Sequence, residues 1–298
     1  MSASEPSRYL LLVNPSAGGG RVSELLPTAE AAMAAAGLEH RTVITTGLEH
    51  GCEEALAGAA AGEIPVVMSG DGLIGQVGGV LADGDVPMGV IPGGRGNDLA
   101  RMLAIPGEID AAVGVLAAGA IRGIDVGVVN GKRFLCIASC GFDSDANRIA
   151  NEAKWIKGNL VYAYAALRAL IAWKPATFTL EIDGDRRQAT GYSVAACNSK
   201  FYGGGMYAAP DAEIDDGLLD VEASGNVGKL RFLRGLGKVF KGEHREIMEV
   251  QSWRGREVRI EANRPFAVYA DGDHIADLPA TVTLLPRALK VIVPAMPS

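Results

Sequence analysis

In the first third of the chain, short apolar runs alternate with longer segments whose apolar residues recur at helical spacing. Most runs end in glycine or a small polar residue, which is typical of a buried strand that enters a tight loop. The pattern predicts strands over residues 9–13, 40–45, 65–68 and 88–91, and helices over 22–36, 53–61, 74–81, 98–103 and 110–118. Strands and helices in alternation with short links predict a parallel sheet covered by helices on both faces.

The pattern changes near residue 123 to short runs in which apolar and polar residues alternate. Turn signals such as Asn130-Gly131 separate some of them. Strands are predicted over 125–129, 133–139, 177–182, 191–197, 218–223, 257–262, 266–270, 281–285 and 289–293, and helices near 144–173 and 230–241. We therefore predict an α/β, Rossmann-like N-terminal domain over residues 1–123 and a β-rich sandwich domain over 124–298. Packing of the last strand back on the first domain is left open.

Composition narrows the function classes. The 298 residues carry a formal net charge of −7 and contain no block of basic residues, which argues against nucleic acid as a partner. The longest apolar segment, residues 160–173, is too short to span a bilayer and contains Arg168. No signal peptide is visible and the four cysteines show no metal-binding spacing, so we expect a cytoplasmic protein. Peripheral attachment to the inner face of the membrane is the alternative.

Glycine-rich loops follow the first, third and fourth predicted strands, in residues 14–20, 69–76 and 91–98. Glycines let a backbone approach a ligand closely with its N–H groups pointing outward, which suits phosphate groups. Asp71 lies inside the second loop. A carboxylate beside an anion requires a cation between them, most simply Mg²⁺. Consecutive loops of this kind predict one nucleotide bound at the carboxyl ends of the strands.

These motifs resemble those of the diacylglycerol kinase catalytic family, which includes bacterial lipid kinases, sphingosine kinases and ceramide kinases. The resemblance covers nearly the whole chain. Its motifs here are Asn14-Pro15-Ser16-Ala17-Gly18, Ser69-Gly70-Asp71-Gly72, residues 91–98, Gly141-Phe142-Asp143-Ser144, residues 202–206, Asp215-Asp216-Gly217 and Tyr269-Ala270-Asp271-Gly272-Asp273. NAD kinases and phosphofructokinases carry related glycine–aspartate loops, and the resemblance implies a first domain of their type.

The resemblance implies transfer of the γ-phosphate of ATP, with Mg²⁺, to a lipid hydroxyl that enters between the domains. It implies that Asp71 acts through Mg²⁺ and that Asp273, where the family usually has Glu, is the general base. The nucleotide-binding residues that it implies are Asn14, Pro15, Ser16, Gly18, Thr46, Gly70, Asp71, Gly72, Leu73, Gln76, Gly94, Arg95, Asn97 and Asp98.

The resemblance also implies a structural Mg²⁺ held by the Asp216 carboxylate and the carbonyl groups of Glu213 and Leu218. Purely structural roles compete with several of these assignments. Asp273 would be part of a hairpin turn, Asp216 part of an Asp-Gly turn, and Thr46 a helix cap.

Three departures from the family pattern keep other functions open. Leu73 stands where the family has Thr, Gly75-Gln76 replaces Asn-Glu, and Arg95 replaces a small hydroxyl residue. We predict a kinase that converts diacylglycerol at a membrane surface to phosphatidic acid. The alternatives are a soluble kinase similar to NAD kinase and a non-catalytic relic that binds lipid or nucleotide. The identity of the lipid and the oligomeric state, including a homodimer, are left open.

A locally basic, amphipathic helix is predicted over residues 228–245. Such a helix could press on anionic lipid. Packing on the β-rich domain explains the same apolar spacing.

Overall fold

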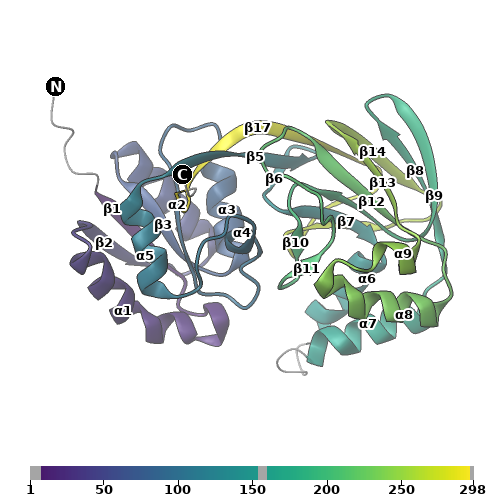
Figure 1. The fold of residues 1–298 in the computed structure, drawn as a ribbon, viewed down its shortest axis with the longest axis horizontal. Helices are drawn as coiled ribbons and strands as arrows, with labels where there is room; N and C mark the ends of the chain where they lie inside the picture. The colour runs from purple at the N-terminus through teal and green to yellow at the C-terminus, as the bar shows by residue number, and fades with distance from the viewer. Residues whose placement is uncertain (1–7, 154–159, 296–298) are drawn as a thin grey trace. The chain divides into compact units, whose positions relative to one another are not determined.

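The computed structural model describes residues 8–153 and 160–295 (Figure 1). The chain divides into two compact units. Unit 1 comprises Met1–Val126 together with Pro286–Ser298, and unit 2 comprises Gly127–Leu285. The C-terminal segment therefore belongs to the same unit as the N-terminal one. Part of the helical region predicted near 144–173 falls on residues 154–159, outside the described residues.

Unit 1 contains a four-stranded parallel sheet in the order β2-β1-β3-β4. The strands are β1 (Tyr9–Val13), β2 (His40–Ile44), β3 (Ile64–Ser69) and β4 (Gly89–Pro92), and the helices are α1 (Arg21–Ala35), α2 (Leu48–Ala60), α3 (Asp71–Leu81), α4 (Asp98–Met102) and α5 (Ile109–Ala118). All five residues of β1 are buried. Burial on both faces is the reason that this strand has no polar residue.

The C-terminal strand returns to the sheet of unit 1. Met88, just before β4, forms a parallel bridge with Val291. The Met88 N–H donates to the Lys290 carbonyl, and the Met88 carbonyl accepts the Ile292 N–H. Lys290 also pairs with Asp85 at 2.7 Å. The two main-chain hydrogen bonds of Met88 supply partners at the edge of the sheet beyond β4.

Unit 2 is built on an antiparallel sheet folded as a β-sandwich. The strand path runs β16-β15-β7-β9-β8-β14-β17-β5-β6, and β12 pairs with both β9 and β13. The strands are β5 (Ile121–Val129), β6 (Lys132–Phe134), β7 (Ile137–Gly141), β8 (Ala176–Ile182), β9 (Asp185–Cys197), β12 (Leu219–Gly225), β13 (Gln251–Gly255), β14 (Glu257–Ala262), β15 (Ala267–Ala270), β16 (Asp273–Asp277) and β17 (Ala280–Ile292), with β10 (Phe201–Tyr202) and β11 (Met206–Tyr207) as a separate pair. The predicted fold class, an α/β domain followed by a β-sandwich, is confirmed.

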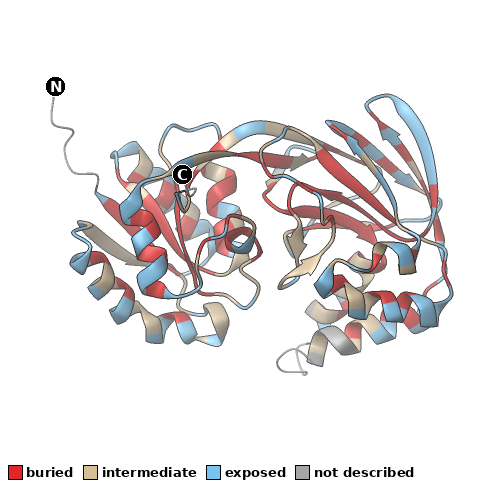
Figure 2. Ribbon diagram, in the orientation of Figure 1, coloured by how far each residue is buried: buried red, intermediate tan, exposed pale blue. Residues whose placement is uncertain are grey.

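Helices pack on this sheet through an aromatic cluster. The helices are α6 (Phe142–Glu152), α7 (Leu160–Ala172), α8 (Lys229–Lys238), the 3-10 turn η2 (Val239–Lys241) and α9 (Arg245–Met248). Phe232 of α8 stacks on Tyr192 of β9 with ring centroids 3.7 Å apart, and Phe142 meets Phe232 edge-on at 4.9 Å. Figure 2 shows the buried strands and the exposed outer surfaces of these helices.

Several strand predictions were wrong in detail. The run predicted over 133–139 is interrupted at Leu135 and Cys136, whose N–H groups bind a carboxylate instead of a neighbouring strand. The two runs predicted over 281–285 and 289–293 form one strand, β17. β13 was missed, because exposed polar residues fill most of its positions and hide the alternation.

Candidate active site

The three glycine loops of unit 1 emerge side by side at one edge of the parallel sheet. The register pairs Val13 of β1 with Met68 of β3, and Ser69 of β3 with Pro92 of β4. The carboxyl ends of these three strands therefore lie at the same level. The Gly93 N–H donates to the Ser69 carbonyl at 2.8 Å, which joins two of the loops directly.

Glycine is required where these loops touch. A Cβ on Gly18 would lie 2.6 Å from the Gly93 carbonyl oxygen, and a Cβ on Gly94 would lie 2.4 Å from the Gly70 Cα. Gly18 also has a φ of 63°, in the left-handed region that favours glycine. The loops thus pack backbone against backbone.

Asp71 joins the second and third loops. Its Oδ1 accepts the N–H of Asp98 at 2.6 Å, and each of these residues is the first of its helix, α3 and α4. A carboxylate here is stabilised by the positive end of a helix. This hydrogen bond fixes Asp71 at the rim of the glycine loops. Its Oδ2 has no hydrogen-bond partner among the described residues.

Arg95 lies over the first loop. A Cβ on Gly19 would be 3.3 Å from Nη2 of Arg95, and the Arg95 side chain is otherwise exposed. The turn below it is held by Asn97, which has a φ of 53° and whose Oδ1 accepts the Gly94 N–H at 2.8 Å. The guanidinium is therefore placed beside the outward-facing loop of residues 16–19.

The other predicted nucleotide residues of unit 1 lie in different surroundings. Asn14 Oδ1 accepts the Ser16 hydroxyl at 2.8 Å and so shapes the first loop, which includes Pro15. Thr46 bonds to His50 Nδ1 and leaves the N-cap position of α2 to Gly47. The Leu73 side chain is buried against Gly51 of α2, and Gln76 is exposed on α3. A Cβ on Gly72 would meet no atom within 4 Å. At Leu73 only the backbone faces the loop.

In unit 2 the structure separates two neighbouring carboxylates. Asp271 and Gly272, both with positive φ, form the tight turn between β15 and β16. The Asp271 carboxylate accepts the N–H groups of Leu135, Cys136 and Ile137 at 2.7–3.1 Å, which holds β7 against the hairpin. Asp273, the first residue of β16, is exposed, and its side chain has no hydrogen bond or ion pair within the described residues. Its carboxylate is therefore the one that remains available.

The Asp216 carboxylate is already paired with a positively charged side chain. Asp216 Oδ1 accepts the Leu218 N–H at 3.0 Å, and its Oδ2 pairs with the Arg254 guanidinium. Arg254 Nε also lies 3.4 Å from Asp220, whose side chain is 7% exposed. No cluster of three or more acidic, His or Cys side chains suited to a metal ion occurs in residues 8–153 and 160–295. Arg254 thus occupies one oxygen of Asp216 in this arrangement, and the metal site of Glu213, Asp216 and Leu218 stays a prediction.

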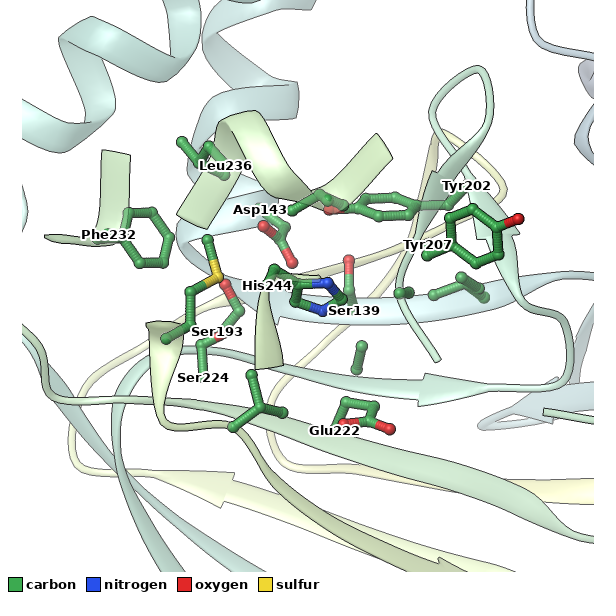
Figure 3. A pocket seen from close by; sticks show the side chains of 16 residues that line it. Ser139, Asp143, Ser193, Tyr202, Tyr207, Glu222, Ser224, Phe232, Leu236 and His244 are labelled. Carbon is green, nitrogen blue, oxygen red and sulfur yellow. The ribbon is translucent and has the colours of Figure 1, made fainter. Parts of the chain in front are cut away.

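A small cavity of about 40 Å³, with both polar and apolar walls, lies beneath α8, within unit 2 (Figure 3). It has room for about three water molecules. Asp143, Ser193 and His244 contribute its polar wall, and Phe232 and Leu236 contribute part of its apolar wall. Among the described residues, His244 Nδ1 is buried without a hydrogen-bond partner.

Burial sets the charge states around this cavity. It raises the pKa of Asp143 to about 6, an effect that the Ser193 hydroxyl reduces. Burial, aided by the Arg245 charge, lowers the pKa of His244. Sequence reasoning missed this cavity, because its residues come from separate strands and helices. The only available signal was Asp143 directly after an apolar strand.

Two family models match the chain. The diacylglycerol kinase catalytic domain matches residues 8–129, and the YegS C-terminal NAD kinase beta sandwich-like domain matches residues 136–293. The second of these covers more than half of the chain.

Whole-length comparisons agree with the family models. The chain is 36% identical over 303 residues to a diacylglycerol kinase of Mycobacterium tuberculosis, covering 97% of this chain and 96% of that protein. It is 28% identical over 296 residues to a diacylglycerol kinase of Bacillus subtilis, covering 96% of each. The fold matches a crystal structure of a diacylglycerol kinase from Bacillus anthracis with a TM-score of 0.77 and 22% identity, over 98% of each chain.

The raised pKa of Asp143 predicts a pH-dependent stability. A shift from 3.8 to about 6 means that the folded state binds this proton more tightly, so ionisation of Asp143 destabilises the fold. The cost is absent below about pH 4 and reaches about 3 kcal/mol above about pH 6. We expect Asp143→Asn to become more stable relative to the wild type as pH rises through this range. Urea unfolding checks this, with Asp145→Asn of the same helix as a control that shows no such trend.

The ion pairs of Arg254 with Asp216 and Asp220 predict how stability changes when Arg254 is removed and when Mg²⁺ is added. We expect Arg254→Ala to lower the free energy of unfolding by about 1–3 kcal/mol, because the buried Asp220 loses its counter-charge. Arg256→Ala removes an exposed neighbour whose side chain has no ion pair within the described residues, and it should change this free energy little. Mg²⁺ without nucleotide should leave the Tm of the wild type unchanged. A rise in that Tm that Asp216→Asn abolishes would show that the loop binds the metal and that the ion-pair interpretation is wrong.

Proposed function

The chain belongs to the diacylglycerol kinase family of lipid kinases, and from this premise we propose that it transfers the γ-phosphate of ATP to diacylglycerol. The product would be phosphatidic acid. The observation that carries the proposal is the convergence of three glycine loops at one edge of the parallel sheet, with Asp71 and Arg95 at their rim.

These loops suit the phosphate groups of ATP. The loop of residues 16–19 and the start of α3 at Gly70-Asp71-Gly72 offer outward N–H groups, and the helix adds positive potential. Asn97 and Asp98 hold the third loop in place, and Thr46 would contact another part of the nucleotide. Bound Mg²⁺ would neutralise phosphate charge and be held by the second oxygen of Asp71, by phosphate and by water. The proposal assigns no metal to the Asp216 loop.

Asp273 would act as the general base. The lipid hydroxyl loses its proton to the Asp273 carboxylate as its oxygen bonds to the γ-phosphorus, and ADP leaves with the electron pair of the broken P–O bond. The exposed and unshared carboxylate of Asp273 supports this role, whereas the three N–H groups bound to Asp271 exclude the neighbouring residue.

The lipid acceptor is supported by the names of the relatives, which are diacylglycerol kinases in Mycobacterium and Bacillus. Within the described residues, no helix is long and apolar enough to cross a bilayer. Because the acceptor proposed here is a membrane lipid, we propose that the protein meets its substrate at a membrane surface.

The direct test is transfer of labelled phosphate from Mg-ATP to a panel of lipids in mixed micelles. Label on diacylglycerol supports the proposal, and label on a sphingoid base or ceramide would redirect it to that lipid. Label only on soluble acceptors would favour a kinase similar to NAD kinase. Failure to bind Mg-ATP by an intact fold would identify a non-catalytic protein.

Asp273 provides a sharp prediction about catalysis. We expect Asp273→Asn to lower kcat by roughly 10²–10⁴-fold, the usual range for loss of a general base. ATP affinity should be unchanged, because the residue receives the acceptor's proton. Asp277→Asn, at the other end of the same strand, is the matched control and should retain activity. Equal activity of both variants would remove Asp273 from the mechanism.

Arg95 predicts a specific effect on nucleotide binding. If its guanidinium contacts a phosphate, Arg95→Ala should raise the Kd for ATP by roughly 10–100-fold, the value of a charge-assisted hydrogen bond. Arg95→Lys should recover part of the loss, because it keeps the charge without the planar fork. Titration calorimetry with ATP measures both. Tighter ATP binding by Arg95→Ala would show instead that the side chain obstructs the loop.

A further inference from the structure

The outer surface of unit 2 has an apolar patch formed by Leu167 and Ile171 of α7, Leu230 and Leu233 of α8, and Phe240 of η2. These are five of the nine large apolar side chains exposed in the described part of the chain, and Ile171 and Leu230 are 71% and 80% exposed. Lys229 at the start of α8 donates to the Ile171 carbonyl at 2.8 Å, which brings the two helices side by side (Figure 1). The concentration of exposed apolar groups in one place indicates an interaction surface.

Helical geometry orders the surface of α8 into strips. Phe232 and Gly235 are buried and face the sheet. At 3.6 residues per turn, Leu230 then lies on the outer side, Leu233 lies on the flank near α7, and Arg231 lies on the opposite flank. The contacts agree, because Arg231 pairs with Glu249 and with the Glu246 carbonyl, both next to α9. Arg234 lies between the flanks, on the outermost side.

The apolar patch therefore borders a basic strip. Residues 228–242 contain five basic residues and no acidic one, in a chain whose net charge is −7. Lys238 pairs with Glu243 at 2.6 Å, whereas Arg234 and Lys241 are exposed and have no ion pair within the described residues. Arg231, Arg234 and Lys238 also line a hollow with Ile247 and Glu246. An anionic group fits this strip by charge.

We propose that this face of α7, α8 and η2 docks on the surface of an anionic lipid bilayer. The apolar side chains would enter the boundary between headgroups and acyl chains, while Arg234 and Lys241 would contact lipid phosphates. The inference rests on the lipid substrate proposed above, since a kinase that acts on a membrane lipid must reach it. The adjacency of apolar and basic strips favours a bilayer surface, in which apolar acyl chains lie directly beneath a layer of anionic phosphates.

The test is sedimentation of the full chain, without ATP, with vesicles of phosphatidylcholine alone or mixed with phosphatidylglycerol. We expect binding to the mixed vesicles that weakens with added salt. Arg234→Gln with Lys241→Gln should lower the partition coefficient roughly 30-fold, at about fivefold per charge. Leu230→Ser with Leu233→Ser should lower it by at least about tenfold. All four side chains are exposed, so the Tm should be unchanged.

Matched controls make the outcome specific. Arg186→Gln with Arg256→Gln removes two exposed charges at the β8–β9 hairpin end of unit 2, and Ile44→Ser with Leu56→Ser removes two exposed apolar groups of unit 1. Neither should affect vesicle binding. Equal loss in a control and its matched variant, or none in the α8 variants, would overturn the proposal. So would a change from dimer to monomer caused by Leu230→Ser with Leu233→Ser.

Docking and catalysis can fail separately. Phosphorylation of a short-chain diacylglycerol dispersed as monomers needs no membrane, so the α8 variants should retain it. Loss of vesicle binding with this activity intact supports the docking surface. Absence of kinase activity in the wild type would refute the proposed function. The vesicle experiment would still test the docking surface, because it requires no ATP.

Discussion

The close packing of three loop backbones at one edge of a parallel sheet is the constraint on which the proposed site depends. Gly18 lies against Gly93, and Gly70 lies against Gly94, at distances that no side chain could occupy. The register of the strands brings the loops to one level, and the missing side chains leave their N–H groups facing outward. Asp71 can reach the Asp98 N–H only because this packing brings α3 and α4 together.

Much of unit 1 could be predicted from sequence because its signals are local. A buried parallel strand has no polar residue, and a glycine loop follows it directly, so β1, β3 and β4 and their loops are visible without knowledge of the partners. Strand β17 was split into two because Pro286 and Arg287 interrupt its apolar alternation, although the backbone continues through them. The Asp143 cavity and the Arg254 pair were invisible, since each depends on side chains from distant strands and helices.

Neighbouring carboxylates show where sequence reasoning ends. Asp271 and Asp273 are two residues apart in one motif, and nothing local distinguishes their chemistry. The difference comes from residues 135–137, far away in the chain, whose N–H groups bind Asp271 and leave Asp273 unbound. At the Asp216 loop a residue nearly forty positions away has a similar effect, because Arg254 pairs with one oxygen of the Asp216 carboxylate. Long-range partners thus decide which acidic group remains available.

Net charge describes a surface poorly when its charges are segregated. The whole chain is acidic, yet residues 228–242 contain five basic residues and no acidic one. Charges are screened over about 8–10 Å at physiological salt, a distance shorter than the width of a folded domain. An approaching bilayer therefore senses the nearest face rather than the sum. The same screening weakens repulsion between the membrane and acidic groups elsewhere in the chain. An overall negative charge therefore does not exclude docking of unit 2 on an anionic membrane.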